Sequence, residues 1–396
     1  MTIDIRYLVF GNMSQSIELI DCDELIEYFP LIFPGWPIVT SPGPDQSPVI
    51  TVKRNKNAYH IDGYWLDKPM RRKNRDDAIC GLVAELMRAY VRDDPQLLCL
   101  HGAAAIFSAK LVVFPSNYRA GKSILSASLV STGVQLFCDD VLPISLAGGE
   151  GIAPGLAMRL RLPLPANLSR LTRKYIDSHI GLEGKQYLYL DCKDGEFAPR
   201  GQKAQIGAFV LLQRETGGAP IFEEISDAEV LRQVVWQNFA REAEAQHILE
   251  VLSQHVADSQ CYRLRYENAD QAASFLKEKF RNWPPDEPGR SKKVVVRHPQ
   301  GNVKQKGLPG YHQRSADISI VLVDDQSFLA DRQGKTIHHL NTIGTAVWSL
   351  LAEPMTLAEL VEVLQAAYPE VEYDIVKSDV IRLLEELTAK NLLVSK

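Results

Sequence analysis

The stretch from Ser116 to Ser123 has the residue types of a loop that binds nucleotide phosphates. It consists of Ser116, Asn117, Tyr118, Arg119, Ala120, Gly121, Lys122 and Ser123, and Ile124 follows it. In such a loop the lysine reaches the β- and γ-phosphates, and the last hydroxyl ligates Mg²⁺. Asp139 and Asp140 end the next apolar run, and two carboxylates beside bound phosphates can hold Mg²⁺ and deprotonate a hydroxyl. Together these residues predict a kinase rather than only a nucleotide-binding protein.

The segments on either side of this loop fit that chemistry. Leu111–Phe114 is a short apolar run before Pro115, and Ile124–Leu129 continues without Gly or Pro, so the pattern predicts strand, loop and helix. Backbone N–H groups at the helix start would face the phosphates, and the helix dipole would favour their charge. Ser116 stands where the usual pattern has Gly, and an ordinary helix N-terminus remains the alternative interpretation.

A histidine precedes the loop at the end of another apolar run. His101 and Gly102 follow Leu97–Leu100, and Lys122 comes 21 positions after His101. Acidic residues at a strand end near a phosphate loop lie where a parallel sheet presents its ligands. Two alternatives stay open: the Asp pair can be an ordinary turn, and an isolated His can be a packed or solvated residue.

Together, His101-Gly102, the loop and the Asp pair resemble the HPr kinase/phosphorylase family and its HPr-kinase-related relatives. The resemblance implies an α/β kinase domain of the HPr-kinase/PEP-carboxykinase type that uses ATP or another nucleoside triphosphate with Mg²⁺. It also implies that Asp140 is the base that deprotonates the acceptor hydroxyl. Asp139 would support it or bind the metal with Ser123, and His101 would contact the phosphate region beside Lys122.

The metal shell departs from that family. The family places a further acidic residue some two dozen positions after the Asp pair, yet residues 155–174 contain no Asp or Glu, and Glu150 is the nearest candidate. Arg159 and Arg161 are instead candidates for neutralising charge on the transferred phosphoryl group, because a planar guanidinium suits phosphate oxygens. A solvated strand face is an equal alternative for these two arginines.

The chain divides by pattern into four parts. Residues 1–92 alternate short apolar runs with Pro-rich turns and end in an apolar helix over 76–92, which predicts a small α+β lobe. Residues 93–281 hold the motifs and continue as strand, helix, helix and strand to Tyr266, as expected of an α/β catalytic domain. Residues 282–310 are rich in Pro, Gly, Lys and Arg and predict a linker, and 311–396 form a separate domain.

Composition limits the choice of partners and compartment. The formal net charge is -5, which gives no reason to expect nucleic acid or an anionic membrane as a partner. The six cysteines are widely spaced and include no Cys-x-x-Cys pair, so reduced thiols in a cytoplasmic protein are expected. No apolar run approaches the length of a membrane span, and the first residues do not resemble a signal peptide. Assembly into a homo-oligomer stays open.

The last part of the chain has the pattern of a winged helix. Short strands are expected over 318–323, 327–330 and 335–340. Asn341 can cap the first helix after them, Thr356 and Glu359 form a capping box for the second, and a third is expected over 374–390.

This part resembles the PqqD family of peptide chaperones, which also occurs as a recognition element in enzymes that modify ribosomally made peptides. The supporting residues are Leu340–Trp348, Thr356–Val361, Tyr368–Pro369 and Leu383–Leu393. The resemblance implies that a precursor-peptide leader adds as a strand to the sheet edge and packs on the last helix. The candidate edge strand consists of Lys335, Thr336, Ile337, His338, His339 and Leu340. A DNA-binding winged helix is the alternative, which Glu385 and Glu386 on the last helix disfavour.

The two resemblances combine into one hypothesis. The C-terminal domain captures the leader of a precursor peptide, and the kinase phosphorylates a Ser or Thr in the attached core. The alternatives are a non-catalytic adaptor that binds nucleotide and a leader peptide, and a kinase that acts on a small metabolite or a carrier protein.

Overall fold

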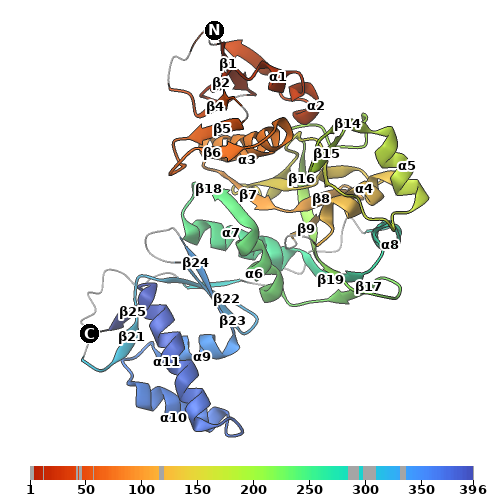
Figure 1. The fold of residues 1–396 in the computed structure, drawn as a ribbon. Helices are drawn as coiled ribbons and strands as arrows, with labels where there is room; N and C mark the ends of the chain where they lie inside the picture. Colours follow the sequence, from red (N-terminus) through yellow and green to blue (C-terminus); the bar gives the residue numbers. More distant parts are fainter. Residues whose placement is uncertain are drawn as a thin grey trace. The chain divides into compact units, whose positions relative to one another are not determined.

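A computed structural model gives the fold and describes residues 4–11, 13–41, 43, 47–56, 58–115, 120–283, 294–297, 309–330 and 336–395. The described residues fall into two compact units. The first comprises Met1–Ile225, Trp236–Ala243 and Asp258–Arg290, and the second comprises Ser226–Val235, Glu244–Ala257 and Ser291–Lys396. Both units mix helices and strands, as the expected α/β class requires (Figure 1).

The first unit begins with a mixed sheet in the strand order β3-β1-β2-β4-β5-β6. Its strands are β1 (Ile5–Phe10), β2 (Ile17–Ile20), β3 (Ile38–Ser41), β4 (Ile50–Asn55), β5 (Ala58–Gly63) and β6 (Met70–Arg72). The helices of this lobe are α1 (Asp23–Ile26), α2 (Phe29–Ile32) and α3 (Arg75–Asp93). Asn74 caps α3 by accepting a hydrogen bond from the Asp77 N–H, and α3 covers the helix expected over 76–92.

A larger sheet follows, in the order β10-β8-β9-β16-β12-β11-β7-β18, with β19 paired to β16 and β17 paired to β19. These strands are β7 (Leu97–His101), β8 (Ala103–Phe107), β9 (Lys110–Phe114), β10 (Leu136–Cys138), β11 (Val141–Ser145), β12 (Glu150–Ile152), β16 (Lys203–Arg214), β17 (Ile221–Glu224), β18 (Asn238–Arg241) and β19 (Gln260–Tyr266). Helices α4 (Lys122–Ser131), α5 (Arg170–Ser178) and α8 (Ala269–Lys279) complete this part with a small sheet of β13 (Arg159–Arg161), β15 (Tyr187–Leu190) and β14 (Ile180–Glu183).

The lobe and the larger sheet share a hydrophobic core. One cluster of buried side chains runs from Phe10 and Ile17 in the lobe to Leu97 and Cys99 on β7. Helix α3 contacts β5 on one side and β7 on the other, as Figure 1 shows. One apolar layer is therefore continuous between the lobe and the larger sheet.

The second unit is built around a sheet in the order β20-β22-β23-β24. Its elements are β20 (Val295–Arg297), β21 (His312–Arg314), β22 (Ser319–Val323), β23 (Gln326–Ala330), β24 (Ile337–Leu340), α9 (Thr342–Leu350), α10 (Leu357–Ala367), α11 (Tyr373–Ala389) and β25 (Leu393–Ser395), where β21 pairs with β25. Most of α6 (Asp227–Gln237) and α7 (Ala245–Asp258) also belongs to this unit.

Two helices of this unit begin at the capping residues that the sequence predicts. Asn341 accepts a hydrogen bond from the Gly344 N–H at the start of α9. Thr356 and Glu359 form both hydrogen bonds of a capping box at the start of α10. Local side-chain chemistry therefore sets these two helix boundaries.

Two features differ from the expected organisation. Val295–Arg297 lies in the expected linker, yet it forms β20 and pairs with β22. Most residues of α6 and α7, expected within the catalytic domain, group with the C-terminal domain instead. Neither difference could be predicted from the local sequence. A three-residue strand is too short to show a periodic pattern, and the pattern of an amphipathic helix does not identify the surface that it covers.

No helix in the described ranges is long and apolar enough to cross a membrane. The six cysteines all lie in those ranges and are free thiols.

Candidate functional site

Strand pairing brings His101 and the Asp pair together. Asp139 and Asp140 form the turn between β10 and β11, and His101 ends β7. Strands β7 and β11 pair antiparallel with Val141 opposite His101, and the Gly102 N–H donates to the Asp140 carbonyl at 3.0 Å. His101 Nδ1 consequently lies 3.3 Å from Asp140 Oδ1.

Lys122 reaches the same place from α4. It is the first residue of that helix, its side chain is buried, and its Nζ lies 3.5 Å from His101 Nε2. Burial lowers the pKa of Lys122, and Asp140 and Asp139 oppose that shift. Burial also lowers the pKa of His101, again against the effect of Asp140. A neutral His101 with its proton on Nδ1 can donate to Asp140 and accept from Lys122.

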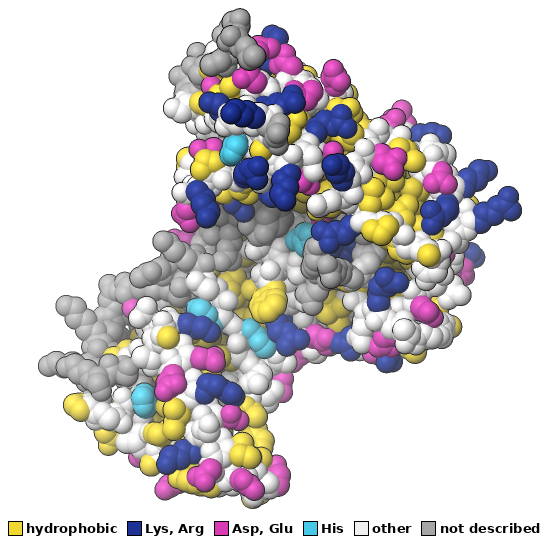
Figure 2. All heavy atoms as spheres, in the orientation of Figure 1, with side chains coloured by type: hydrophobic (Ala, Val, Ile, Leu, Met, Phe, Trp, Pro, Cys, Tyr) yellow, Lys and Arg dark blue, Asp and Glu magenta, His cyan; other side chains and the backbone are white. Residues whose placement is uncertain are grey.

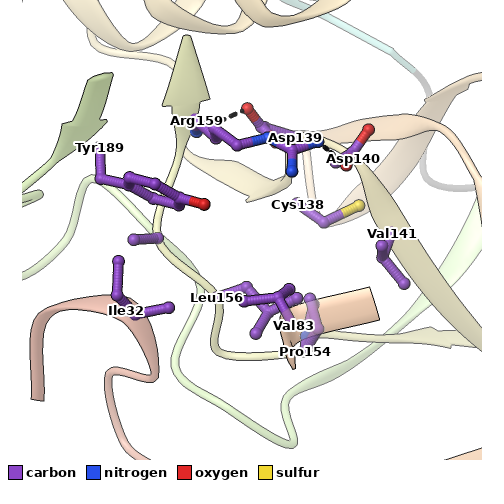
Figure 3. Close-up of a pocket in the computed structure, with 11 residues that line it drawn as sticks. Ile32, Val83, Cys138, Asp139, Asp140, Val141, Pro154, Leu156, Arg159 and Tyr189 are labelled. Atoms are coloured by element: carbon purple, nitrogen blue, oxygen red, sulfur yellow. Dashed lines mark hydrogen bonds and ion pairs between the residues drawn. The ribbon is translucent and has the colours of Figure 1, made fainter. Parts of the chain in front are cut away.

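Arg159 holds both carboxylates. Its Nη2 lies 2.7 Å from Asp140 Oδ2, and its backbone N–H donates to Asp139 Oδ2 at 3.0 Å. The guanidinium carbon also lies 4.9 Å from the ring centre of Tyr187. Figure 3 shows Arg159 beside Asp139 and Asp140 at the edge of a pocket. Arg159 therefore neutralises and orients the Asp pair, a contact that the sequence did not predict.

Asp139 has the environment of a cation ligand. It is 6% exposed, and burial together with the neighbouring Asp140 raises its pKa to about 7. The Ser123 hydroxyl donates a hydrogen bond to it, which opposes the shift. A bound divalent cation would favour the ionised carboxylate, and carboxylate and hydroxyl oxygens are the hard ligands that Mg²⁺ takes. Ser123 and Asp139 therefore fit a magnesium ion.

Few side chains besides Ser123 and Asp139 are placed to bind a metal at this site. In the described part of the chain, no group of three His, Cys, Asp or Glu side chains is close enough to hold a metal. Glu150, the acidic candidate nearest in sequence, lies on β12 opposite Gln205, with Lys203 Nζ 4.0 Å from its carboxylate. A cation at Asp139 would thus take its remaining ligands from water and from the phosphates themselves.

The N-terminal lobe forms the opposite wall of the carboxylate pocket. Ile32 of α2 and Val83 of α3 face Asp139 and Asp140 across the pocket, with Leu156 beside them (Figure 3). Cys80 of α3 accepts a hydrogen bond from Arg159 Nη1 at 2.5 Å. These residues carry no sequence motif, because they come from the lobe and reach the site only through tertiary packing.

The remaining predicted residues divide into three groups. Ala120, Gly121 and Ile124 lie at the start of α4, where a phosphate loop requires them. Arg161 contacts a different group from Arg159: its Nη2 lies 3.5 Å from the Tyr187 hydroxyl. Ser116, Asn117, Tyr118 and Arg119 are outside the described residues, as is Lys335.

Strand β24 contains most of the expected peptide-binding residues. Among the described strands it ends the order β20-β22-β23-β24, and it pairs with β23 with His339 opposite Phe328. The described strand covers Ile337–Leu340, and Thr336 precedes it. An edge strand presents backbone N–H and C=O groups on its outer side, so a further strand can pair there.

Both faces of this sheet are covered within the second unit. Leu329 and Leu340 pack with Val347 and Trp348 of α9 in the core under α9–α11. Phe328 alternates with Leu329 along β23, so it points to the other face, and it is fully buried. Two hydrogen bonds join the sheet to the helices from mid-chain. The Ala228 N–H donates to Asp324 Oδ2 at 3.1 Å, and Ser319 Oγ donates to Gln246 Oε1 at 2.7 Å.

Comparison with known proteins identifies this C-terminal region. Residues 320–393 match the family model described as coenzyme PQQ synthesis protein D (PqqD), so the chain has a C-terminal PqqD domain. A solved structure described as "TbiB1 in Complex with the TbiA(beta) Leader Peptide" is 30% identical and covers 21% of this chain and 96% of that chain, with a TM-score of 0.20. A search of curated proteins found no match.

Proposed function

We propose that the protein is an ATP-dependent kinase that phosphorylates a Ser or Thr hydroxyl of a ribosomally made precursor peptide. The observation that carries the proposal is the group formed by Lys122, His101 and Asp140 at the start of α4. Phosphoryl transfer needs mainly positioning and charge neutralisation, and a lysine, a carboxylate base and a metal-binding carboxylate meet that need. The resemblance to HPr-kinase-related proteins, which rests on these residues and the loop before Lys122, agrees with the proposal.

The proposed reaction assigns one role to each group. Asp140 accepts the proton of the acceptor hydroxyl, and that oxygen attacks the γ-phosphorus of ATP while the bond to the ADP oxygen breaks. Lys122 neutralises charge on the transferred group, and His101 and Arg159 hold Asp140 in place. Ser123 and Asp139 would hold Mg²⁺, which would supply charge neutralisation during the transfer.

The PqqD domain is proposed to capture the leader of the peptide. A leader strand would pair with the outer side of β24, where main-chain hydrogen bonds give affinity and neighbouring side chains give selectivity. Tethering by the captured leader raises the concentration of the core peptide near the kinase site, so weak contacts there suffice. Arg382 of α11 pairs with Asp379, and acidic and basic side chains mix over this domain in Figure 2, which favours a peptide over DNA.

The test is a phosphorylation assay with the full chain. The protein is incubated with Mg-ATP and precursor peptides encoded by neighbouring genes, and the peptides are analysed by mass spectrometry. A gain of one phosphoryl group on a Ser or Thr of the core is expected, and a matched peptide without its leader should react far more slowly. Absence of the phosphoryl group on every peptide would remove the substrate assignment.

An adaptor that binds nucleotide and leader without catalysis is the second candidate. The ion pair between Arg159 and Asp140 favours it, because a neutralised carboxylate is a poorer base. Peptide maturation that continues with Asp140→Asn would support the adaptor over the kinase.

A further inference from the structure

The parallel strands of the larger sheet end together beside α4. Strand β16 runs parallel to β9 on one side and to β19 on the other. Strand β9 leads into the loop before α4, β16 ends at Arg214, and β19 ends at Tyr266. Ligands of open α/β sheets bind beyond the carboxyl ends of such strands. Arg214 and Tyr266 therefore lie at the same edge of the sheet as the start of α4, although no sequence motif marks them.

Tyr266 braces the loop. Its hydroxyl donates to the Ala120 carbonyl at 2.9 Å, and its side chain is 3% exposed. Gly121 has φ +90°, and a Cβ at that position would lie 2.8 Å from the Tyr266 hydroxyl. Tyr266 consequently fixes the backbone at the start of α4, and its buried ring is not available to stack on a ligand.

Arg214 lies on the open side of the same turn. A Cβ at Gly121 would be 3.2 Å from Arg214 Cδ, so the stem of this side chain crosses the start of α4. The side chain is exposed, and its Nη2 donates to the Glu267 carbonyl at 3.4 Å, a weak bond that a ligand can replace. The guanidinium thus stands at the rim of a cleft whose walls include Ile124, Asn167 and Asn268.

A shallow, open hollow that shares Asn167, Glu267 and Asn268 adjoins the cleft and extends to Pro220. Lys122 points the other way, toward His101 and the Asp pair. If the terminal phosphate of a nucleotide binds at Lys122, its ribose and base would therefore lie on the side of α4 where Ile124 and Arg214 are.

We infer that this cleft takes the ribose and base of the bound nucleotide and that Arg214 is a binding residue for them. The inference rests on the proposed kinase function and adds the nucleoside subsite to it. A guanidinium can donate hydrogen bonds to ribose and base oxygens or stack on the base.

The test measures binding of two Mg²⁺ complexes, ATP and inorganic tripolyphosphate, to the full chain by titration calorimetry. Arg214→Gln should weaken ATP binding about tenfold, as expected for loss of hydrogen bonds from a charged donor, and should leave tripolyphosphate binding unchanged. Arg281→Gln is the matched control, because Arg281 is exposed and pairs with Glu278 on the surface. Lys122→Met should weaken both ligands.

The other outcomes separate the two proposals. Wild-type protein that binds neither ligand would overturn the kinase function and this subsite with it. ATP binding that Lys122→Met weakens and Arg214→Gln leaves intact would overturn the subsite alone. Equal weakening of both ligands by Arg214→Gln would also overturn it, because Arg214 would then contact the phosphates.

Discussion

His101 Nδ1 lies 3.3 Å from Asp140 Oδ1 because the two residues sit at the end of one antiparallel strand pair. The pairing of β7 with β11 brings the two side chains to this contact. Lys122 then joins the pair through His101 Nε2 at 3.5 Å.

Asp140→Asn should lower the rate of peptide phosphorylation at least about 100-fold, because the amide cannot accept the hydroxyl proton. ATP affinity should stay close to that of the wild type, since Lys122 and α4 are unchanged. Rates are measured by mass spectrometry of the peptide and affinity by calorimetry. Asp177→Asn, an exposed residue of α5, is the matched control. Full transfer activity in Asp140→Asn would contradict the role of Asp140 as a base.

Gly121→Ala should lower the affinity for ATP in addition to lowering the stability of the fold. The new methyl group would meet the Tyr266 hydroxyl at 2.8 Å, in a backbone with φ +90°. Gly201→Ala separates the two effects, because Gly201 has φ +83° with open space around the added atom. Gly201→Ala should lose about 1 kcal/mol of stability through backbone strain, and Gly121→Ala should lose more, because the Tyr266 hydroxyl must also shift. Calorimetry should show the loss of ATP affinity in Gly121→Ala alone, and equal affinities would refute the prediction.

Proline substitutions test the edge of β24. Alternate residues of a strand direct their N–H groups to opposite sides, so either His338 or His339 directs its N–H away from β23. Of His338→Pro and His339→Pro, the one that removes the outward N–H should weaken leader binding about tenfold and keep the β23 pairing. His338→Ala and His339→Ala keep the N–H groups and serve as controls. Binding is followed by anisotropy of a labelled leader, and unchanged affinity in both proline variants would exclude this edge.

Thr356→Ala should lower the free energy of unfolding of the PqqD domain by about 1 kcal/mol. It removes the hydroxyl that accepts from the Glu359 N–H, while Glu359 accepts from the Thr356 N–H at 2.7 Å. The Thr356 N–H and hydroxyl both donate to the Glu359 carboxylate and lower the pKa of Glu359. Because Thr356→Ala removes this hydroxyl, the difference from wild type should persist at neutral pH and shrink as acid protonates Glu359. Urea unfolding at several pH values measures it. Thr388→Ala near the end of α11, which removes a hydroxyl bonded to the Leu384 carbonyl, is the control.

The parts of the fold that depend on local chemistry could be predicted from the sequence. The strand before the loop and the helix after it follow from apolar runs, and the caps at Asn341 and Thr356 need only nearby side chains. The PqqD region could also be recognised, because several short motifs follow one another in the order typical of that family. The family match over 320–393 confirms it.

The rest depends on contacts between distant segments. Arg159 was predicted to neutralise phosphate charge, and the structure pairs it with Asp140, because β13 brings its backbone N–H to Asp139. Val83 and Cys80 reach the site only when α3 packs against β7. Arg214 is the last residue of β16, which carries no sequence motif, and only the parallel register of β16 with β9 places it beside α4.

Helices α6 and α7 limit where this protein can be truncated, because most of their residues belong to the second unit. Between these helices the chain returns to the first unit as β18, which pairs with β7, the strand that ends at His101. A truncation before residue 311 would therefore leave α6 and α7 without their hydrogen-bond partners in β22 and in the turn between β22 and β23. Excising this compact unit intact would require both helices, so the unit is discontinuous in the sequence.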